Sequence, residues 1–286
     1  MKPYEDYLII SDLDGTIIPR GGRVSEANKK AAADFTAGGG HFGIATGRTP
    51  EAAAGYLEGV TITAPSVFFN GSMLYDWQKK QVILTKPLTA IRDEDGHPDP
   101  TIWPLFAQRC LELFPEACLE VYTEDNCNII SDPKNDDPRL PHEYYKYRHC
   151  ALSEVANLMR TPWLKFFACD TPENLRRLEQ LAEDMGTAAL SHHFYSEANY
   201  HEFVAQGVSK GSMLSEIRRL PAFRGLKIIA LGDYLNDQEL LEEADIGIAA
   251  SNAHEKLKEA ADFVGCAAED DLLVWLLEHF EDITGK

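Results

Sequence analysis

Side chains that can bind a metal ion or a phosphate group fall in four short segments of this chain. The first segment is Ser11-Asp12-Leu13-Asp14-Gly15-Thr16, with two aspartates two residues apart and a threonine close behind. Carboxylate oxygens with a few open coordination positions suit Mg²⁺, and a lysine at the start of a helix attracts anions. The other segments are Thr46-Gly47-Arg48, Ser209-Lys210-Gly211 and Gly232-Asp233-Tyr234-Leu235-Asn236-Asp237.

Each of these segments stands where a predicted strand ends or a predicted helix begins. Apolar runs predict strands over residues 7–10, 41–45, 66–69, 226–231 and 246–249, with helices between them. That alternation favours a parallel α/β sheet, and ligands of such sheets bind beyond the carboxyl ends of the strands. The rule selects these residues: Asp12, Asp14, Thr16, Thr46, Gly47, Arg48, Asn70, Gly71, Lys210, Gly232, Asp233, Asn236, Asp237 and Asn252.

The surrounding sequence supplies starts and stops for these elements. Ser25 is a predicted N-cap and Pro50 opens a helix, while Asn70-Gly71 predicts a hairpin turn between residues 66–69 and 72–75. Later helices are expected over residues 209–220, 236–244, 252–261 and 270–280.

The alternating pattern stops in the middle of the chain. Residues 86–100 resemble a linker, residues 132–149 a polar loop, and the strands and helices between them follow no regular order. We therefore expect an α/β fold with a Rossmann-like parallel-sheet core over residues 1–84 and 201–286. Residues 85–200 are predicted to form an inserted α+β domain.

Composition bounds the function. The chain of 286 residues has a net charge of −19, which disfavours nucleic acid and anionic membranes as partners. A phosphorylated substrate would also be repelled, so the site needs local positive charge. There is no apolar run of about 18 residues and no signal-like N-terminus, and the six cysteines form no Cys-x-x-Cys pair. A cytoplasmic protein, monomeric or a weak homodimer, is the expectation.

Taken alone, each segment could be an ordinary turn or a solvated helix start. Together, in the order D-x-D-G-T, T-G-R, S-K-G and G-D-x-x-N-D, they resemble the haloacid dehalogenase superfamily of phosphohydrolases. The insertion between the second and third motifs is similar to that of its large-cap, Cof-like branch, which includes many sugar-phosphate phosphatases.

The resemblance implies a catalytic role for four residues. Asp12 would be the nucleophile that forms an aspartyl-phosphate. Asp14 would protonate the leaving oxygen and then deprotonate the attacking water. Thr46 and Lys210 would hold the transferring phosphoryl oxygens. A carboxylate nucleophile divides one difficult displacement into two easier steps.

The resemblance also implies a cofactor and a binding set. Mg²⁺ would be held by Asp12, the backbone carbonyl of Asp14, and Asp233, with Asp237 joining directly or through water. Many relatives have a small residue where this chain has Tyr234, which could narrow the site. The expected substrate-binding residues are Thr16, Gly47, Arg48, Asn70, Gly71, Lys165 and Asn236.

The sequence leaves two interpretations open for several residues. Arg48 could reach the substrate or a structural carboxylate, and Lys165 could face the substrate or form a salt bridge, with Glu202 nearby on the same pocket side. His192, His193 and His201 fit no common metal-ligand spacing, so a transition-metal site is not expected. A surface loop is favoured for His142, His149 and Cys150.

Three functions are compatible with the motifs. The favoured one is a magnesium-dependent phosphatase acting on a small phosphorylated metabolite, with a sugar phosphate as the expected substrate. The second is a hexose-phosphate phosphomutase. The third, a non-enzymatic phospho-acceptor signalling domain, does not need the second aspartate or an insertion of roughly a hundred residues.

Overall fold

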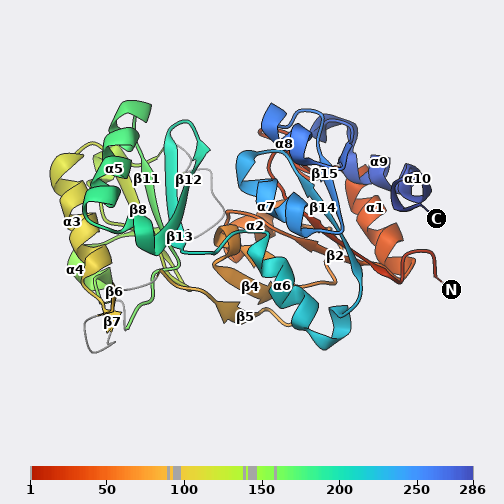
Figure 1. Ribbon diagram of the computed structural model, residues 1–286, viewed down its shortest axis with the longest axis horizontal. Coiled ribbons are helices and arrows are strands. Elements are labelled where there is room, and N and C mark those ends of the chain that lie inside the picture. Colours follow the sequence, from red (N-terminus) through yellow and green to blue (C-terminus); the bar gives the residue numbers. More distant parts are fainter. Residues whose placement is uncertain are drawn as a thin grey trace. The chain divides into compact units, whose positions relative to one another are not determined.

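The computed structural model describes residues 2–88, 91–92, 98–137, 140, 147–157 and 160–285. These residues form two compact units, shown in Figure 1. One unit, the core, comprises Met1–Leu84 and Ser209–Lys286, and the other, the inserted unit, comprises Thr85–Val208. The second boundary is later than the predicted one. The strand β13 (Tyr200–Ala205) pairs with two strands of the inserted unit, so residues 201–208 belong there.

The core unit contains the predicted parallel sheet. Its strand order is β16-β15-β14-β1-β2, and every neighbouring pair is parallel. All five residues of β1 are buried, as expected for a strand with elements on both of its faces. The α/β fold class is thus confirmed. The strands are β1 (Tyr7–Ser11), β2 (His41–Ile44), β14 (Lys227–Gly232), β15 (Ile246–Ala249) and β16 (Phe263–Val264).

The register of this sheet brings its carboxyl ends level. Ser11 is paired with Leu231 on β14 and with Ile44 on β2. Consequently the residues that follow these strands, beginning with Asp12, leave the sheet at the same edge.

The third predicted strand is present but joins the core sheet differently. Strand β3 (Ser66–Phe68) pairs antiparallel with β4 (Met73–Asp76), which neighbours β5 (Gln81–Thr85). A lone parallel bridge between Ala45 and Val67 links β3 to the end of β2. The predicted hairpin at Asn70 is confirmed, although four residues rather than two separate the paired Phe68 and Met73.

Helices cover the core sheet, and several begin later than predicted. Ser25 and Thr49 cap the first two through their side-chain oxygens, as their sequence positions suggested. The helix expected from residue 209 begins at Ser212, and the one expected over residues 270–280 is divided at His279. The helices are α1 (Glu26–Ala37), α2 (Pro50–Tyr56), α6 (Ser212–Arg219), α7 (Gln238–Glu243), α8 (Glu255–Ala260), α9 (Leu272–Glu278) and α10 (Phe280–Thr284).

The inserted unit is a mixed sheet with helices on one face, which fits the predicted α+β class (Figure 1). Its strand order is β10-β9-β8-β11-β13-β12, antiparallel except between β9 and β10. The remaining elements are β6 (Ile91–Arg92), β7 (Pro98–Asp99), α3 (Ile102–Leu113), β8 (Cys118–Tyr122), β9 (Cys127–Ile129), β10 (Tyr147–His149), α4 (Leu152–Val155), β11 (Lys165–Cys169), α5 (Pro172–Asp184) and β12 (Ser191–Glu197).

Alternation along these strands gives the sheet two different faces. One face packs against α3 and α5 through large apolar side chains such as Phe106, Phe166 and Phe203. The opposite face carries Glu120, Lys165 and Glu202, the residues between or beside those core positions.

The sequence predicts a loop over residues 132–149, but residues 147–149 form strand β10, so the end of that prediction is wrong. His142 lies outside the described residues. Across the ranges that the structure describes, no helix is both long enough and apolar enough to cross a membrane.

Candidate active site

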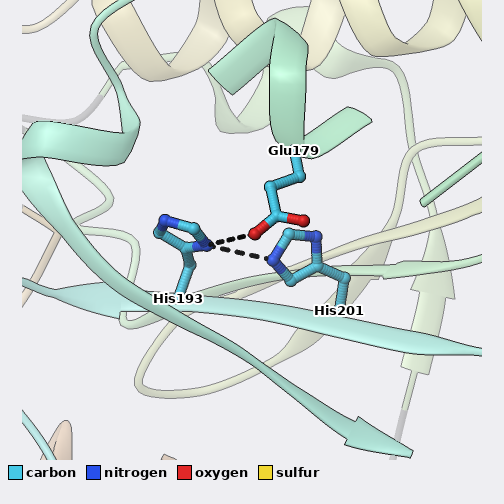
Figure 2. A group of neighbouring side chains, drawn as sticks. All are labelled: Glu179, His193 and His201. Carbon is cyan, nitrogen blue, oxygen red and sulfur yellow. Dashed lines mark hydrogen bonds and ion pairs between the residues drawn. The ribbon is translucent and has the colours of Figure 1, made fainter. Parts of the chain in front are cut away.

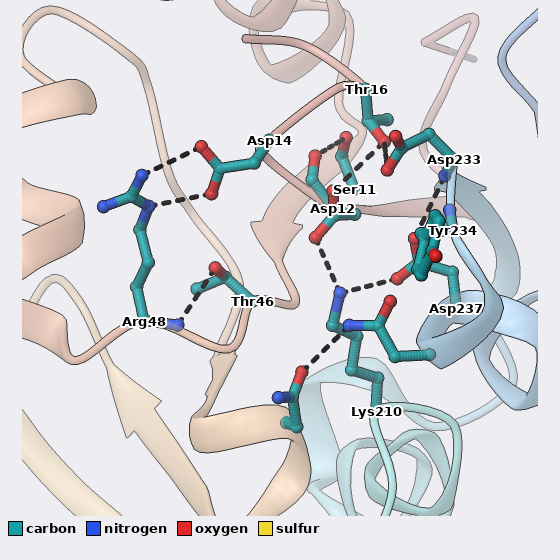
Figure 3. A network of polar contacts seen from close by, with 12 residues as sticks. Ser11, Asp12, Asp14, Thr16, Thr46, Arg48, Lys210, Asp233, Tyr234 and Asp237 are labelled. Atoms are coloured by element: carbon teal, nitrogen blue, oxygen red, sulfur yellow. Dashed lines mark hydrogen bonds and ion pairs between the residues drawn. The ribbon is translucent and has the colours of Figure 1, made fainter. Parts of the chain in front are cut away.

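Asp12 lies at the point where β1 ends and is almost fully buried. Its backbone N–H donates to the carbonyl of Leu231 at 2.9 Å, which extends the β1–β14 pairing by one residue. The hydroxyl of Thr16 donates to Asp12 Oδ2 at 3.1 Å and lies 3.4 Å from Asp233 Oδ1. The first segment therefore turns back on itself and brings its threonine between two carboxylates, as Figure 3 shows.

The turn requires glycine at position 15. Gly15 has φ of +84°, a left-handed conformation that favours glycine, and a Cβ there would lie 2.1 Å from Asp233 Oδ2. Asn252 holds the same turn from the other side. Its amide donates to the Gly15 carbonyl at 2.8 Å and accepts from the Ala268 N–H at 2.9 Å. Sequence reasoning placed Asn252 at a strand end but gave it no role.

Lys210 bridges the first and last segments. Its Nζ donates to Asp12 Oδ1 and to Asp237 Oδ1, each at 2.6 Å, and all three side chains are buried. The loop that carries Lys210 packs tightly on the β3–β4 hairpin, because a Cβ on Gly71 would lie 2.2 Å from the Ser209 carbonyl oxygen. Gly71 therefore allows the close backbone approach that places the ammonium group.

Asp237 organises the segment after β14. Its second oxygen, Oδ2, accepts the backbone N–H groups of Asp233 at 3.0 Å and Tyr234 at 3.2 Å. Both oxygens of Asp237 thus have partners in the protein. This arrangement assigns Asp237 a clear part in folding the turn and orienting Asp233, in addition to the metal contact that the sequence suggested.

Burial places a strong electrostatic constraint on this cluster. Burial and the neighbouring charge of Asp237 raise the pKa of Asp12 to about 7. Burial, Asp12 and Asp237 raise the pKa of Asp233 to about 8. Burial by itself would lower the pKa of Lys210, but Asp12 and Asp237 outweigh it and raise that pKa. One ammonium group leaves negative charge uncompensated among three carboxylates.

These carboxylates fit a hard divalent cation. One oxygen from each of Asp12, Asp233 and Asp237 lies within 4.8 Å of the other two. Oxygen donors in an incomplete shell suit Mg²⁺, which usually keeps several waters. A cation between them would also supply the positive charge that the raised pKa values indicate is lacking.

Asp14 and Arg48 form the outer part of the site. Arg48 Nε and Nη2 donate to the two oxygens of Asp14 at 2.8 and 2.9 Å, and the Arg48 guanidinium lies over the Tyr56 ring. Half of the Asp14 side chain is exposed. Of the two interpretations of Arg48, the structure therefore favours the carboxylate partner. The Thr46 hydroxyl, buried between the strands, accepts the Arg48 backbone N–H at 3.2 Å.

The remaining predicted residues of the core also gather here. Asn236 Nδ2 donates to Asn70 Oδ1 at 3.2 Å, which joins the last segment to the β3–β4 hairpin. Gly47 lies against Asn70, since a Cβ on Gly47 would be 2.8 Å from the Asn70 amide nitrogen. Lys165 is the exception. It belongs to the inserted unit, where its ammonium lies 2.9 Å from Glu202, as the salt-bridge interpretation proposed.

Comparison with known sequences gives a family. A model of haloacid dehalogenase-like hydrolases matches residues 9–277. One similar protein, an endoribonuclease named YBEY from Arabidopsis thaliana chloroplasts, is 27% identical over 94% of this chain. The chain spans 45% of that protein's length. Another, the pyridoxal phosphate phosphatase YbhA of Escherichia coli, is 23% identical, with 95% of this chain and 98% of that protein covered.

Solved structures share the fold over the whole chain. TM0651 from Thermotoga maritima superposes with a TM-score of 0.78 at 24% identity and covers 96% of this chain and 97% of its own. A subclass IIB sugar phosphatase, BT4131, gives a TM-score of 0.75 at 20% identity, with 96% and 98% covered. At these identities the likeness concerns the fold.

Proposed function

The chain belongs to the haloacid dehalogenase-like hydrolases, and we propose that it is a magnesium-dependent phosphatase of small phosphorylated metabolites. The observation that carries the proposal is the buried cluster of Asp12, Lys210, Asp233 and Asp237 at the carboxyl edge of the core sheet. It combines a carboxylate nucleophile with an ammonium group at hydrogen-bonding distance and three carboxylate oxygens within 4.8 Å of one another that could hold a cation.

Asp12 is the proposed nucleophile. One of its carboxylate oxygens attacks phosphorus, the bond from phosphorus to the ester oxygen breaks, and an aspartyl-phosphate forms. Lys210, already 2.6 Å from Asp12 Oδ1, stabilises negative charge on the equatorial phosphoryl oxygens. The Thr46 hydroxyl and the helix-start loop at Lys210 complete the cradle for those oxygens.

Asp14 is the proposed acid and base. In its protonated form it gives a proton to the departing ester oxygen. As a carboxylate it then takes a proton from the water that attacks the aspartyl-phosphate, which releases inorganic phosphate and restores Asp12. Because Arg48 contacts both oxygens of Asp14, this ion pair must open for either transfer. Arg48 therefore holds Asp14 in position between the two steps.

Mg²⁺ held by Asp12, Asp233 and the turn around Asp237 would neutralise charge on the phosphoryl group during transfer. The cation would also offset the repulsion between an anionic substrate and a protein with a net charge of −19. Phosphate monoesters hydrolyse so slowly without a catalyst that several such devices must act together.

The substrate class is proposed from the relatives and from the inserted unit. YbhA is named for pyridoxal phosphate and BT4131 as a sugar phosphatase, so both suggest a compact phosphorylated metabolite. On the helix-free face of the inserted sheet, Lys165 pairs with Glu202, and the acid Glu120 lies one strand away. All three side chains are buried, so the description of BT4131 as a sugar phosphatase is what supports a sugar phosphate as our proposed substrate.

Hydrolysis of para-nitrophenyl phosphate by the full chain tests this function. We expect activity with Mg²⁺, none after chelation by EDTA, and a loss of at least about 10³-fold in Asp12→Asn. Asp125→Asn, a matched change at an exposed loop position, should keep full activity. Magnesium-independent activity, or an active Asp12→Asn protein, would refute the proposal.

A panel of sugar phosphates and pyridoxal phosphate then tests the substrate class. Free phosphate release identifies a phosphatase, whereas conversion between hexose-phosphate isomers without release identifies a phosphomutase. Lys165→Met should raise KM for the preferred substrate while kcat changes little. If Lys165→Met leaves KM unchanged for every compound that turns over, Lys165 does not contact substrate.

A further inference from the structure

A second group of potential metal ligands lies in the inserted unit, away from the acidic cluster. His193 on β12 and His201 on β13 are on the sheet face that packs against α5, and Glu179 reaches them from that helix (Figure 2). The strands pair His193 with Phe203 and Tyr195 with His201, so the two histidines are diagonal neighbours. Strand β12 is the edge strand of its sheet, and His193 and Glu179 are partly exposed whereas His201 is buried.

The distance between the two histidines matches one edge of a tetrahedral metal site. His193 Nδ1 lies 3.2 Å from His201 Nε2 and 3.9 Å from Glu179 Oε1, and one ligand atom of each residue is within 4.8 Å of the others. Metal–ligand bonds of about 2.0–2.1 Å at tetrahedral angles place neighbouring ligand atoms roughly 3.3 Å apart. The 3.9 Å separation of His193 and Glu179 is longer than this, and the Glu179 and His201 ligand atoms lie within 4.8 Å, so Glu179 must move toward both histidines to complete the triangle.

The donor atoms suit a borderline-soft cation. Two imidazole nitrogens and one carboxylate oxygen are ligands that zinc and similar first-row transition metals prefer. The cluster in the core unit, by contrast, offers only oxygen atoms. A metal of this class binds imidazole through an unprotonated ring nitrogen.

Hydrogen bonding alone leaves this group incompletely satisfied. Neutral His193 and His201 can share one hydrogen bond, whichever ring donates. The other ring nitrogen of His201, Nδ1, is buried and has no hydrogen-bond partner among the residues that the structure describes. A metal bound to His201 Nε2 would fix the remaining ring proton on Nδ1 and would not itself satisfy that atom.

Tyr195 prepares Glu179 for coordination. Its hydroxyl donates to Glu179 Oε2 at 2.8 Å, and its ring stacks on His201 with centroids 4.4 Å apart. Glu179 Oε1 is left facing His193. Hydrogen bonds that fix a ligating carboxylate are typical of the groups that surround protein metal sites.

We propose that Glu179, His193 and His201 bind one divalent transition-metal ion of the zinc class, with a solvent molecule as the fourth ligand. The ion ties the β12–β13 hairpin to α5 and stabilises the inserted unit. The sequence spacing of the histidines does not indicate this site, because the third ligand, Glu179, lies earlier in the chain in α5 and comes close to the histidines only in the folded protein.

Cobalt spectroscopy on the full chain tests the site. Protein stripped with EDTA and returned to excess Mg²⁺, which occupies the oxygen cluster, is titrated with Co²⁺. Four-coordinate Co²⁺ with nitrogen ligands absorbs strongly in the visible range, whereas octahedral oxygen coordination gives weak colour, so the spectrum separates the two sites. We expect one strongly absorbing equivalent that Zn²⁺ displaces, together with a higher Tm in Zn²⁺.

Variants assign the signal to residues. His193→Gln and Glu179→Gln should abolish the strong Co²⁺ band while magnesium-dependent phosphatase activity persists, which also shows that they fold. Tyr195→Phe should weaken Co²⁺ binding by about 10–100-fold. His192→Gln, a change at the neighbouring residue that points to the other sheet face and contacts the Val208 carbonyl, should retain the band. So should Asp233→Asn in the oxygen cluster.

Two results would overturn the proposal. One is a wild-type protein that takes up no strongly absorbing equivalent of Co²⁺ at micromolar concentrations. The other is a band of full intensity in His193→Gln, because the ion would then be held by other residues. In the first case the group is a neutral imidazole pair beside a carboxylate, stabilised by hydrogen bonding alone.

Discussion

The two clusters of potential metal ligands respond to burial in opposite directions. In the core unit, burial raises the pKa values of Asp12 and Asp233 and so favours protonated, neutral carboxyls. In the inserted unit, burial lowers the pKa values of His193 and His201 and so favours deprotonated, neutral rings. Both trends have the same origin, since a low-dielectric environment disfavours the charged form of any group.

The consequence for metal binding differs between the clusters. The carboxylates must be charged to act as ligands, so the core unit needs Lys210 and a cation to keep them ionised. The imidazoles bind metal in the neutral form that burial already provides. The core cluster therefore depends on positive charge that offsets its ionised carboxylates, whereas the histidines of the inserted cluster carry no charge to offset.

Lys210→Met should have the largest effect. It removes the cation that lies 2.6 Å from both Asp12 and Asp237 and leaves buried carboxylates without it. Loss of one partner from a buried ion pair typically costs about 3–5 kcal/mol. We expect urea unfolding of the metal-free protein to show this loss of stability, and Mg²⁺ to recover part of it. Lys227→Met, at an exposed position on β14, is the control and should change little.

Gly15→Ala should disable the oxygen cluster by geometry rather than by charge. Its Cβ would lie 2.1 Å from Asp233 Oδ2, so Asp233 must move. Displacement of a catalytic group by about 1 Å can cost around 100-fold in rate, and we expect that loss in kcat/KM. Gly207→Ala controls for backbone strain, because Gly207 also has positive φ but nothing within 4 Å of its Cβ position. Equal losses in both variants would show that strain alone is responsible.

The two clusters also differ in how far the sequence could predict them. Asp12, Lys210 and Asp233 follow strands or precede helices of a parallel sheet, and topology brings such positions to one edge. Local sequence thus located the core cluster, including Asn70 and Asn236. It could not indicate that Arg48 would pair with Asp14, because that depends on where a loop side chain lies after folding.

The inserted unit gave weaker signals for physical reasons. Its sheet is mixed and its strands β9 and β10 are three residues long, too short for alternation to be distinguished from chance. The ligand group of Glu179 and two histidines depends on strand register and on helix packing across the sheet. Neither is encoded in local spacing, so the sequence predicts no metal site at the histidines and predicts a boundary that is too early at β13.

The pH dependence of stability should have opposite signs in the two units of metal-free protein. Asp12 and Asp233 have folded-state pKa values raised to about 7 and 8, so the core loses stability as the pH rises from about 4 to 8. His201 has a pKa lowered to about 3, so the inserted unit loses stability as the pH falls from 6.5. Each group contributes about 1.4 kcal/mol per pH unit within its window.

Hydrogen exchange measured by mass spectrometry can follow both units in one sample with EDTA, at pH 5 and pH 7.5. Peptides from β1 and β14 should gain protection at the lower pH after correction for intrinsic exchange, and peptides from β12 and β13 should lose it. His201→Gln should reduce the dependence in the inserted unit, where His193 also contributes, while the core keeps its own. If protection changes in the same direction in both units, burial does not act on the two clusters in opposite ways.

Arg48→Lys should have the smallest effect and should be confined to catalysis. A lysine cannot donate two parallel hydrogen bonds to Asp14, so the proposed acid–base carboxyl becomes less well positioned and kcat/KM should fall about tenfold. Arg218→Lys, which alters another exposed arginine–aspartate pair, should leave kcat/KM unchanged. Cobalt binding at His193 should also be unaffected. The decisive comparison is in an Asp14→Asn background, where Arg48→Lys should cost little more. A further tenfold loss there would mean that Arg48 acts on the phosphate group of the substrate instead.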